Sequence, residues 1–111
     1  DLVIGHHPHV LQGVEIARTG ARRALIAYSL GNFLFDGHKD AEKQSAILEC
    51  RFGRAGLVSA TVVPVQIDHS APRPARGPER AAILFRLDAL SRPLGVSAPG
   101  GAIRPVTIGN R

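Results

Sequence analysis

Residues 1–12 read DLVIGHHPHVLQ, which places three histidines around a proline directly after an apolar run. The apolar run ends at Gly5, as a buried strand does where it meets a loop. Pro8 fixes its own φ and disfavours a helical conformation at the residue before it. We therefore expect a stiff, extended loop over residues 6–10, at the carboxyl end of a strand, where α/β proteins commonly place functional sites.

The histidines of this loop are candidate functional residues. Neutral imidazole is the commonest protein ligand for zinc and also suits iron and other transition metals. On an extended segment residues i and i+2 point the same way, so His7 and His9 are expected to aim at one point as metal ligands. His6 then points toward a second ion, a substrate or a hydrogen-bonding partner, and is the candidate catalytic residue. The alternative is a solvated turn whose histidines satisfy local backbone groups.

A second unusual stretch is YSLGNFLFD, residues 28–36, in which Gly31 and Asn32 interrupt an otherwise apolar strand. Glycine inside a strand indicates a bulge or a close approach of another backbone. Ser29 and Asn32 bring polar groups into what should be core, and we expect them to lie beside the histidine loop and to orient a ligand there. The alternative is a structural bulge, in which Asn32 satisfies a distorted ladder.

Further candidates lie in the polar segment that follows. Asp36, Asp40 and Glu42 could approach the histidines, although surface charge is the simpler interpretation. His38 and His69 lie in polar loops, and we assign both to the surface.

The rest of the chain predicts an α/β (α+β) fold of mostly antiparallel strands with one helix. Leucine and isoleucine recur at helical spacing over residues 79–92, and Pro78 suits the first turn of a helix. Pro64 cannot donate to a ladder and therefore marks an edge or a bulge. The expected hairpins span residues 14–30 and 45–67, a Pro-rich connector follows at 68–78, and a short strand is expected at 103–108.

Composition and charge narrow the function classes. The chain has 111 residues, 44% hydrophobic and 21% charged, which suits a single globular domain. Its net charge is +5, but the arginines are scattered and the aromatic residues few, so no nucleic-acid partner is expected. The single cysteine, Cys50, excludes an internal disulfide. The absence of methionine predicts that the chain is a piece of a longer protein.

Two motifs together, GHHPHV at residues 5–10 and SLGNFLFD at 29–36, resemble those of the CapA family of bacterial poly-γ-glutamate capsule biosynthesis proteins. That family is similar to the calcineurin-like metallophosphoesterase superfamily. The resemblance implies the C-terminal part of a four-layer β-sandwich with flanking helices. Residues 1–95 would form this C-terminal portion, and residues 96–111 would be a Gly/Pro-rich tail.

The resemblance also implies a metal centre. In that superfamily a late G-H-x-H motif supplies histidines to a pair of divalent ions, which hold the water that attacks phosphorus. Here the pattern falls on His7 and His9, and the additional His6 leaves open which two of the three would bind. The superfamily's earlier motifs would lie before Asp1. The resemblance therefore implies two divalent ions in the full-length domain and an inactive site in these residues alone.

Two functions are compatible with these features. The first is metal-dependent hydrolysis of a phosphoester-like substrate by a full-length capsule biosynthesis protein. The second is a non-catalytic role in exporting or assembling an anionic polymer such as polyglutamate, at the cell envelope or extracellular face that the resemblance implies. The net charge of +5 favours the second function slightly, although a positive surface would also attract an anionic substrate to a catalytic site.

Overall fold

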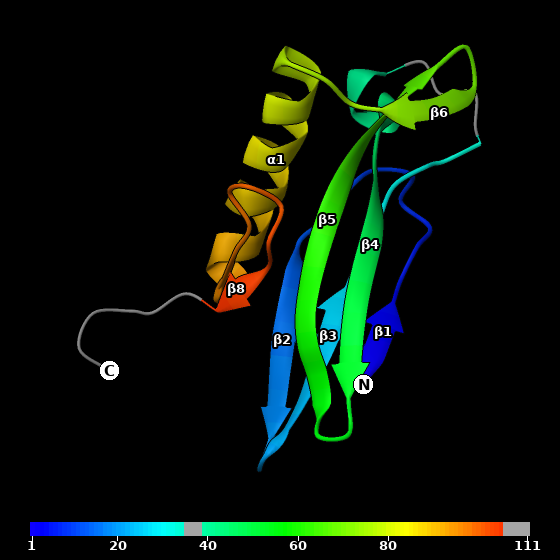
Figure 1. Cartoon of the computed structure of the whole chain (residues 1–111). Coiled ribbons are helices and arrows are strands. Elements are labelled where there is room, and N and C mark those ends of the chain that lie inside the picture. The colour runs from blue at the N-terminus through cyan, green and yellow to red at the C-terminus, as the bar shows by residue number, and fades with distance from the viewer. Residues whose placement is uncertain (35–38, 106–111) are drawn as a thin grey trace.

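The computed structural model describes residues 1–34 and 39–105, which form two three-stranded β-sheets, a small two-stranded sheet and one long helix (Figure 1). The first sheet has the strand order β1-β3-β2. Its strands are β1 (Leu2–Ile4), β2 (Val14–Thr19) and β3 (Arg22–Ala27). β2 and β3 form the antiparallel hairpin predicted within residues 14–30, and β1 runs parallel to β3 on its other side. The histidine loop therefore starts where β1 leaves the sheet.

The second sheet has the order β4-β5-β6 and is antiparallel throughout. Its strands are β4 (Gln44–Gly53), β5 (Gly56–Asp68) and β6 (Ala71–Pro74), and the short 3₁₀ helix η1 (Asp40–Lys43) precedes them. The hairpin of β4 and β5 confirms the prediction for residues 45–67. Strand β6 lies within the segment predicted as a connector, because two prolines in four residues hide the pattern of an edge strand.

Pro64 lies in the middle strand of this sheet, so its predicted place at an edge or a bulge is wrong. Pro64 pairs opposite Ala46 of β4 without a register shift at that point. Its carbonyl oxygen accepts a hydrogen bond from the backbone N–H of Ala75 at 3.0 Å. The backbone nitrogen of Pro64 therefore points toward β6, just beyond the last residue pair of the β5–β6 ladder. The missing N–H group removes no hydrogen bond between paired strands there.

The predicted helix is confirmed as α1 (Pro78–Ser91), followed by the 3₁₀ turn η2 (Arg92–Leu94). The chain then forms a small hairpin of β7 (Val96–Ser97) and β8 (Arg104–Pro105). Val96 and Ala98 are buried in the main core, so residues 96–98 pack as part of the fold. The strand expected at 103–108 appears as β8 in its described part, and residues 106–108 lie outside the described residues.

Asp88 of α1 ties this last hairpin to the helix. Its Oδ1 accepts the backbone N–H of Ala98 at 2.8 Å, and its Oδ2 accepts Nε of Arg92 at 2.7 Å. The Arg92 guanidinium and the Ala98 amide hold the pKa of Asp88 below its ordinary value. The segment after the helix is thus fixed by directed hydrogen bonds as well as by apolar burial.

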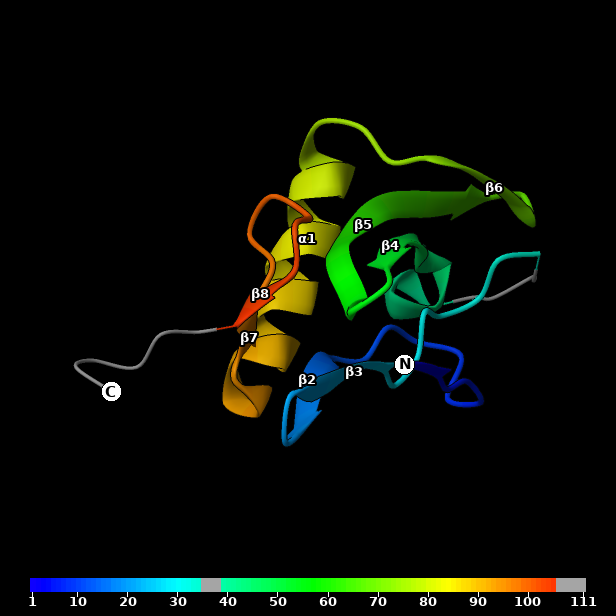
Figure 2. The same cartoon turned by 60° about the horizontal axis from the view of Figure 1, so that its bottom comes forward.

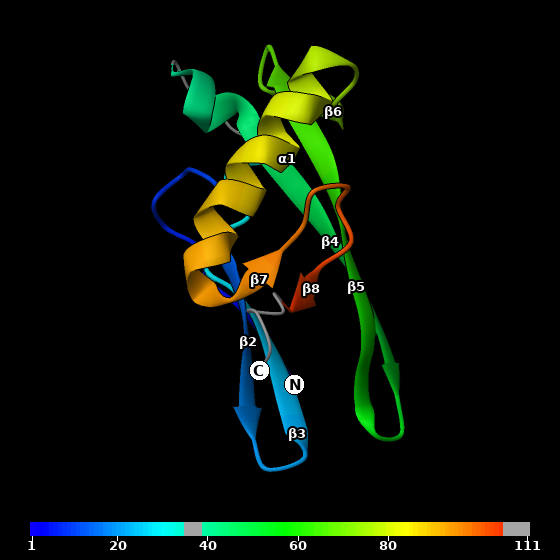
Figure 3. The same cartoon turned by 90° about the vertical axis from the view of Figure 1, so that its left-hand side faces the viewer.

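The two sheets face each other, and α1 with the β7–β8 hairpin closes one side of the space between them (Figures 2 and 3). Ser91 of the helix is fully buried, and its Oγ accepts the backbone N–H of Val14 of β2 at 3.0 Å. This mixed fold of mostly antiparallel strands and one helix confirms the predicted class. No helix among the described residues is long and apolar enough to cross a bilayer. The core side chains come from both sheets, the helix and the last hairpin: Leu11, Val14, Ala27, Ala46, Val62, Ala75, Ile83, Leu87, Val96 and Ala98.

Candidate functional site

The histidine loop begins at a point where the backbone is tightly packed. The N–H of Gly5 donates to the carbonyl of Ala27 at 2.7 Å, which continues the pairing of β1 with β3 by one residue. A Cβ atom at Gly5 would lie 2.5 Å from the carbonyl oxygen of Tyr28. Only glycine fits this position, so the loop leaves the sheet at a fixed place.

The loop itself is not extended, which corrects the expectation from Pro8. His7 has φ +123° and His9 has φ +63°, a region that side chains other than glycine rarely adopt. The rule that residues i and i+2 of an extended segment point the same way therefore does not apply to His7 and His9. His6, His7 and His9 are all exposed to solvent. Their roles as catalytic residue and metal ligands stay predictions.

Asn32 links the histidine loop to the segment that precedes β4. Nδ1 of His9 lies 2.7 Å from Oδ1 of Asn32, and Nδ2 of Asn32 donates to the backbone carbonyl of Glu42 at 2.9 Å. The Asn32 side chain is only 7% exposed. The structure thus brings together the GHHPHV and SLGNFLFD motifs, although His9 and Asn32 are 23 positions apart in the sequence.

This arrangement fixes the tautomer of His9. A backbone carbonyl can only accept, so the amide nitrogen of Asn32 must face Glu42 and its oxygen must face His9. The Asn32 oxygen is also only an acceptor, so Nδ1 of His9 must carry a proton. In the neutral ring Nε2 is then the nitrogen with the lone pair, the one able to coordinate a metal or accept a proton. Metal-ligating histidines are typically oriented in this way through their other ring nitrogen.

The backbone around Asn32 is shaped by Gly31 and two buried serines. Gly31 has φ +77°, and a Cβ atom there would lie 2.7 Å from the carbonyl oxygen of Gln44. Oγ of Ser29 accepts the N–H of Gly31 at 3.2 Å, and Oγ of Ser45 donates to the carbonyl of Leu30 at 3.0 Å. Ser29 therefore supports the turn that presents Asn32, and its role in orienting a ligand stays a prediction.

The carboxylates predicted near this site lie in the turn η1 or outside the described residues. Oε1 of Glu42 accepts the backbone N–H of Lys39 at 3.1 Å, at the start of η1. Asp40 is exposed in the same turn, and Asp36 and His38 fall in the undescribed segment 35–38. His69 is exposed, as predicted, in the turn between β5 and β6.

The described residues supply at most a part of the ligands that a metal centre needs. Within residues 1–34 and 39–105, no three His, Cys, Asp or Glu side chains lie close enough to hold an ion together. A zinc site needs three or four protein ligands, and a two-metal site needs more. Nε2 of His9 is the ring nitrogen left with a lone pair, and the described residues do not supply the further ligands that a metal centre would need.

Comparison with known proteins places these motifs in a family. The model of the bacterial capsule synthesis protein PGA_cap matches residues 1–37, a range that contains the histidine loop and Asn32. Two curated proteins align with about two thirds of the chain. The capsule biosynthesis protein CapA of Bacillus anthracis is 39% identical over 74 residues. The PGA biosynthesis protein CapA of Bacillus subtilis is 34% identical over 76 residues. This chain is a relative of the CapA capsule biosynthesis proteins.

The chain covers only a small part of these CapA proteins. The aligned residues span 67% of this chain but 17% of the Bacillus anthracis protein, and 68% of this chain but 19% of the Bacillus subtilis protein. The predicted resemblance to CapA-type proteins is confirmed at this level.

One contact of the CapA-like site could not be inferred from the sequence. The carbonyl of Glu42, which fixes the Asn32 amide, is a backbone group on a 3₁₀ turn, and no residue type marks it. The histidine-rich loop and the Gly31–Asn32 interruption were the visible signals, because both place polar residues inside apolar runs.

Proposed function

We propose that this CapA-like chain contributes histidine ligands to a divalent-metal centre that hydrolyses a phosphoester or a related anionic substrate during capsule biosynthesis. The observation that carries the proposal is the contact of 2.7 Å between Nδ1 of His9 and Oδ1 of Asn32. That contact is what a metal-ligating histidine needs, because it leaves Nε2 as the coordinating atom. The remaining ligands would have to come from residues outside the described part of this chain.

The strained backbone of the loop supports the same proposal. His7 at φ +123° and His9 at φ +63° each occupy a conformation that costs about 1–3 kcal/mol for a residue other than glycine. Such strain persists where the surrounding structure over-determines it, and it concentrates at functional sites. The fixed exit at Gly5 and the Asn32 contact supply that constraint here.

Each histidine has a distinct part in the proposal. His9 would be a ligand through Nε2, held in orientation by Asn32, and His7 would be the second ligand of the pair. His6 would be an additional ligand or would contact the anionic substrate. A bound divalent ion lowers the pKa of its water and polarises a phosphoryl oxygen. Asn32 would hold the proton of His9 on Nδ1 throughout.

A second candidate function is non-catalytic handling of an anionic polymer. Five arginines in the tips of the two hairpins favour it. The relatives are named for capsule and PGA biosynthesis, and in either function this chain would meet an anionic partner.

Metal binding can be tested on the chain itself by titrating Mn²⁺ while recording the histidine ring signals by NMR. We expect the His9 and His7 signals to broaden at lower Mn²⁺ concentrations than those of His69, which is an exposed histidine in a turn away from the loop. Asn32→Ala should weaken this binding about 10- to 100-fold, because the ring loses the partner that orients it. Equal broadening of all histidines, or no effect of Asn32→Ala, would refute the ligand assignment.

A further inference from the structure

One edge of the second sheet is long, regular and open. Strand β4 is the outer strand in the order β4-β5-β6, and on its side away from β5 a bridge joins Ser45 to Gly31. From Ile47 to Gly53 no other strand of the described residues pairs with that side. The unmatched residue of the β4–β5 ladder, Val58, belongs to β5, so β4 itself is not bulged. This stretch therefore presents free backbone N–H and C=O groups to a further strand.

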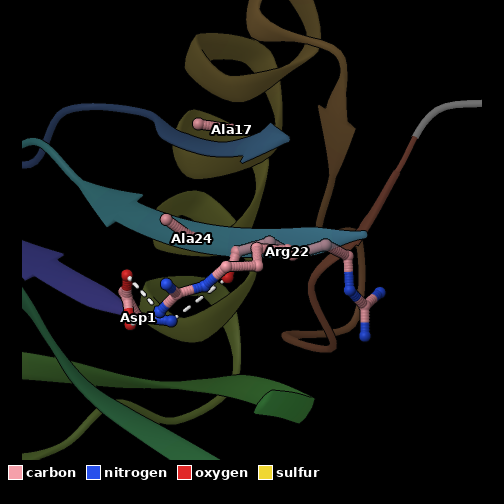
Figure 4. A pocket seen from close by; sticks show the side chains of 5 residues that line it. Asp1, Ala17, Arg22 and Ala24 are labelled. Atoms are coloured by element: carbon pink, nitrogen blue, oxygen red, sulfur yellow. Dashed lines mark hydrogen bonds and ion pairs between the residues drawn. The ribbon is translucent and has the colours of Figure 1, made fainter. Parts of the chain in front are cut away.

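The other sheet edges are short or covered. Strand β6 has four residues, and two of them are prolines, which cannot donate to a ladder. Strand β1 has three residues, and an ion pair lies at its start, with Nη2 of Arg22 3.2 Å from Oδ1 of Asp1 (Figure 4). Strand β2 is tied to the helix by the bond from the Val14 N–H to Ser91. Short length and proline are usual protections of an edge against another chain, and the open stretch of β4 has neither.

The open stretch has two charged side chains, Glu49 and Arg51, on one face of the sheet because they are two residues apart. Both are exposed. In β5 they lie opposite Thr61 and Ser59, which are uncharged, and neither forms an ion pair with another described residue. Opposite charges that face each other across two strands stabilise the pair, and like charges destabilise it. The edge therefore favours a strand that sets a cation opposite Glu49 and an anion opposite Arg51.

A second copy of β4 supplies this pattern in one antiparallel register. When Cys50 of the two copies face each other, Glu49 of each copy lies opposite Arg51 of the other. Centring the pair on Glu49 or on Arg51 would instead set like charges face to face. Registers shifted by a single position are excluded, because they would oppose a residue whose N–H and C=O point outward to one whose groups point to β5. The favoured register also uses the whole open stretch, since Cys50 is the middle of residues 47–53.

The inner face of β4 gains apolar burial in the same register. Leu48 and Cys50 pack at the margin of the core between the two sheets, and Phe52 is 48% exposed. Leu48 of one copy would lie opposite Phe52 of the other, on the face of the sheet that is turned toward the first sheet. Each core would thus be extended by an aromatic side chain of the second copy.

We propose that two copies of this chain pair antiparallel through β4, with Glu49 of each opposite Arg51 of the other. The pairing joins their three-stranded sheets into one continuous sheet and is isologous, with a two-fold axis at Cys50. The candidate site lies beyond the start of β4, where Gly31 already occupies the edge. The proposed interface therefore does not depend on the proposed metal centre.

Analytical ultracentrifugation of the whole chain, with circular dichroism to check folding, measures the Kd of the dimer. Glu49→Arg sets like charges opposite each other twice and should raise the Kd about tenfold, and Arg51→Glu should do the same. These variants change the net charge in opposite directions, so equal effects cannot follow from net charge. The double variant Glu49→Arg/Arg51→Glu restores opposite charges in both pairs and should return the Kd to within about twofold. A monomeric unmodified chain, or a double variant as weak as the single ones, would overturn the proposal.

Disulfide cross-linking tests the register without changing the charges. Residues directly opposite in antiparallel strands have Cα atoms about 4.5–5.5 Å apart, which a disulfide can span. Diamide, which accepts the two electrons and two protons of the thiols, should therefore link the unmodified chain into dimers through Cys50. The control Cys50→Ala/Ile47→Cys moves the thiol to a more exposed position that faces Gly53, and it should not cross-link. Equal cross-linking of both proteins would show that the register is wrong.

His9→Ala separates this proposal from the metal-centre proposal. It removes the candidate ligand and should leave the Kd of the dimer unchanged, because the histidine loop lies outside the β4 pairing. A rise of the Kd in this variant as large as in Glu49→Arg would contradict pairing through residues 47–53.

Discussion

Leu87→Ala should lower the free energy of unfolding of this chain by about 2–5 kcal/mol. Leu87 is 1% exposed and packs in the core that joins both sheets, α1 and the last hairpin. Removing its side chain loses apolar burial and leaves a cavity that the surrounding strands can fill only in part. Urea denaturation followed by circular dichroism measures the change.

Phe85→Ala is the matched control for that prediction, because Phe85 lies on the same helix and is 77% exposed. Its replacement should change the free energy of unfolding by no more than about 0.5 kcal/mol. If the two variants were equally destabilising, α1 would not pack against the sheets through the face that contains Leu87.

Gly31→Ala should both destabilise the fold and disrupt the candidate site. Gly31 has φ +77°, and the new Cβ would meet the carbonyl oxygen of Gln44 at 2.7 Å. The left-handed backbone alone costs roughly 1–3 kcal/mol for a residue other than glycine, and the backbone contact adds to this cost. Because Asn32 follows directly, the shift should also weaken its bond to His9. Denaturation and the chemical shifts of the His9 ring measure the two effects.

Gly20→Ala separates backbone strain from the steric contact. Gly20 has a similar φ of +62° at the hairpin tip, but a Cβ atom there would meet nothing within 4 Å. This variant should cost about 1 kcal/mol and leave the His9 signals unchanged. A Gly31→Ala variant no less stable than Gly20→Ala would show that the approach of Gln44 does not constrain the turn.

The parts of the fold that were predicted correctly depend on local sequence signals. Gly20 and the GRAG turn mark hairpins between apolar runs, and Pro78 with the spaced leucines marks the helix. Strand β6 was missed because Pro72 and Pro74 are unusual in strands, although at an edge their missing donors are tolerated. The burial of Val96 and Ala98 depends on how far the chain turns back after α1, which no local pattern encodes.

The candidate site was predictable in composition but not in geometry. Three histidines in four residues and a Gly–Asn pair inside an apolar run are visible in the sequence. The left-handed backbone at His7 and His9 was not foreseen, because the rule for residues before proline predicts an extended chain. The approach of Asn32 to His9 depends on the pairing of strands far apart in sequence. The Asn32 amide is fixed by a backbone carbonyl, that of Glu42, and every residue type has a backbone carbonyl, so the sequence does not mark this contact.

The central claim is that Asn32 holds the proton of His9 on Nδ1 and so presents Nε2 to a metal ion. Long-range ¹H–¹⁵N correlation NMR of the imidazole rings tests it directly, at about pH 8, where an unperturbed histidine is neutral. The account predicts a protonated Nδ1 and an unprotonated Nε2 at His9, and it predicts that Asn32→Ala removes this preference. A protonated Nε2 at His9 in the unmodified chain would contradict it.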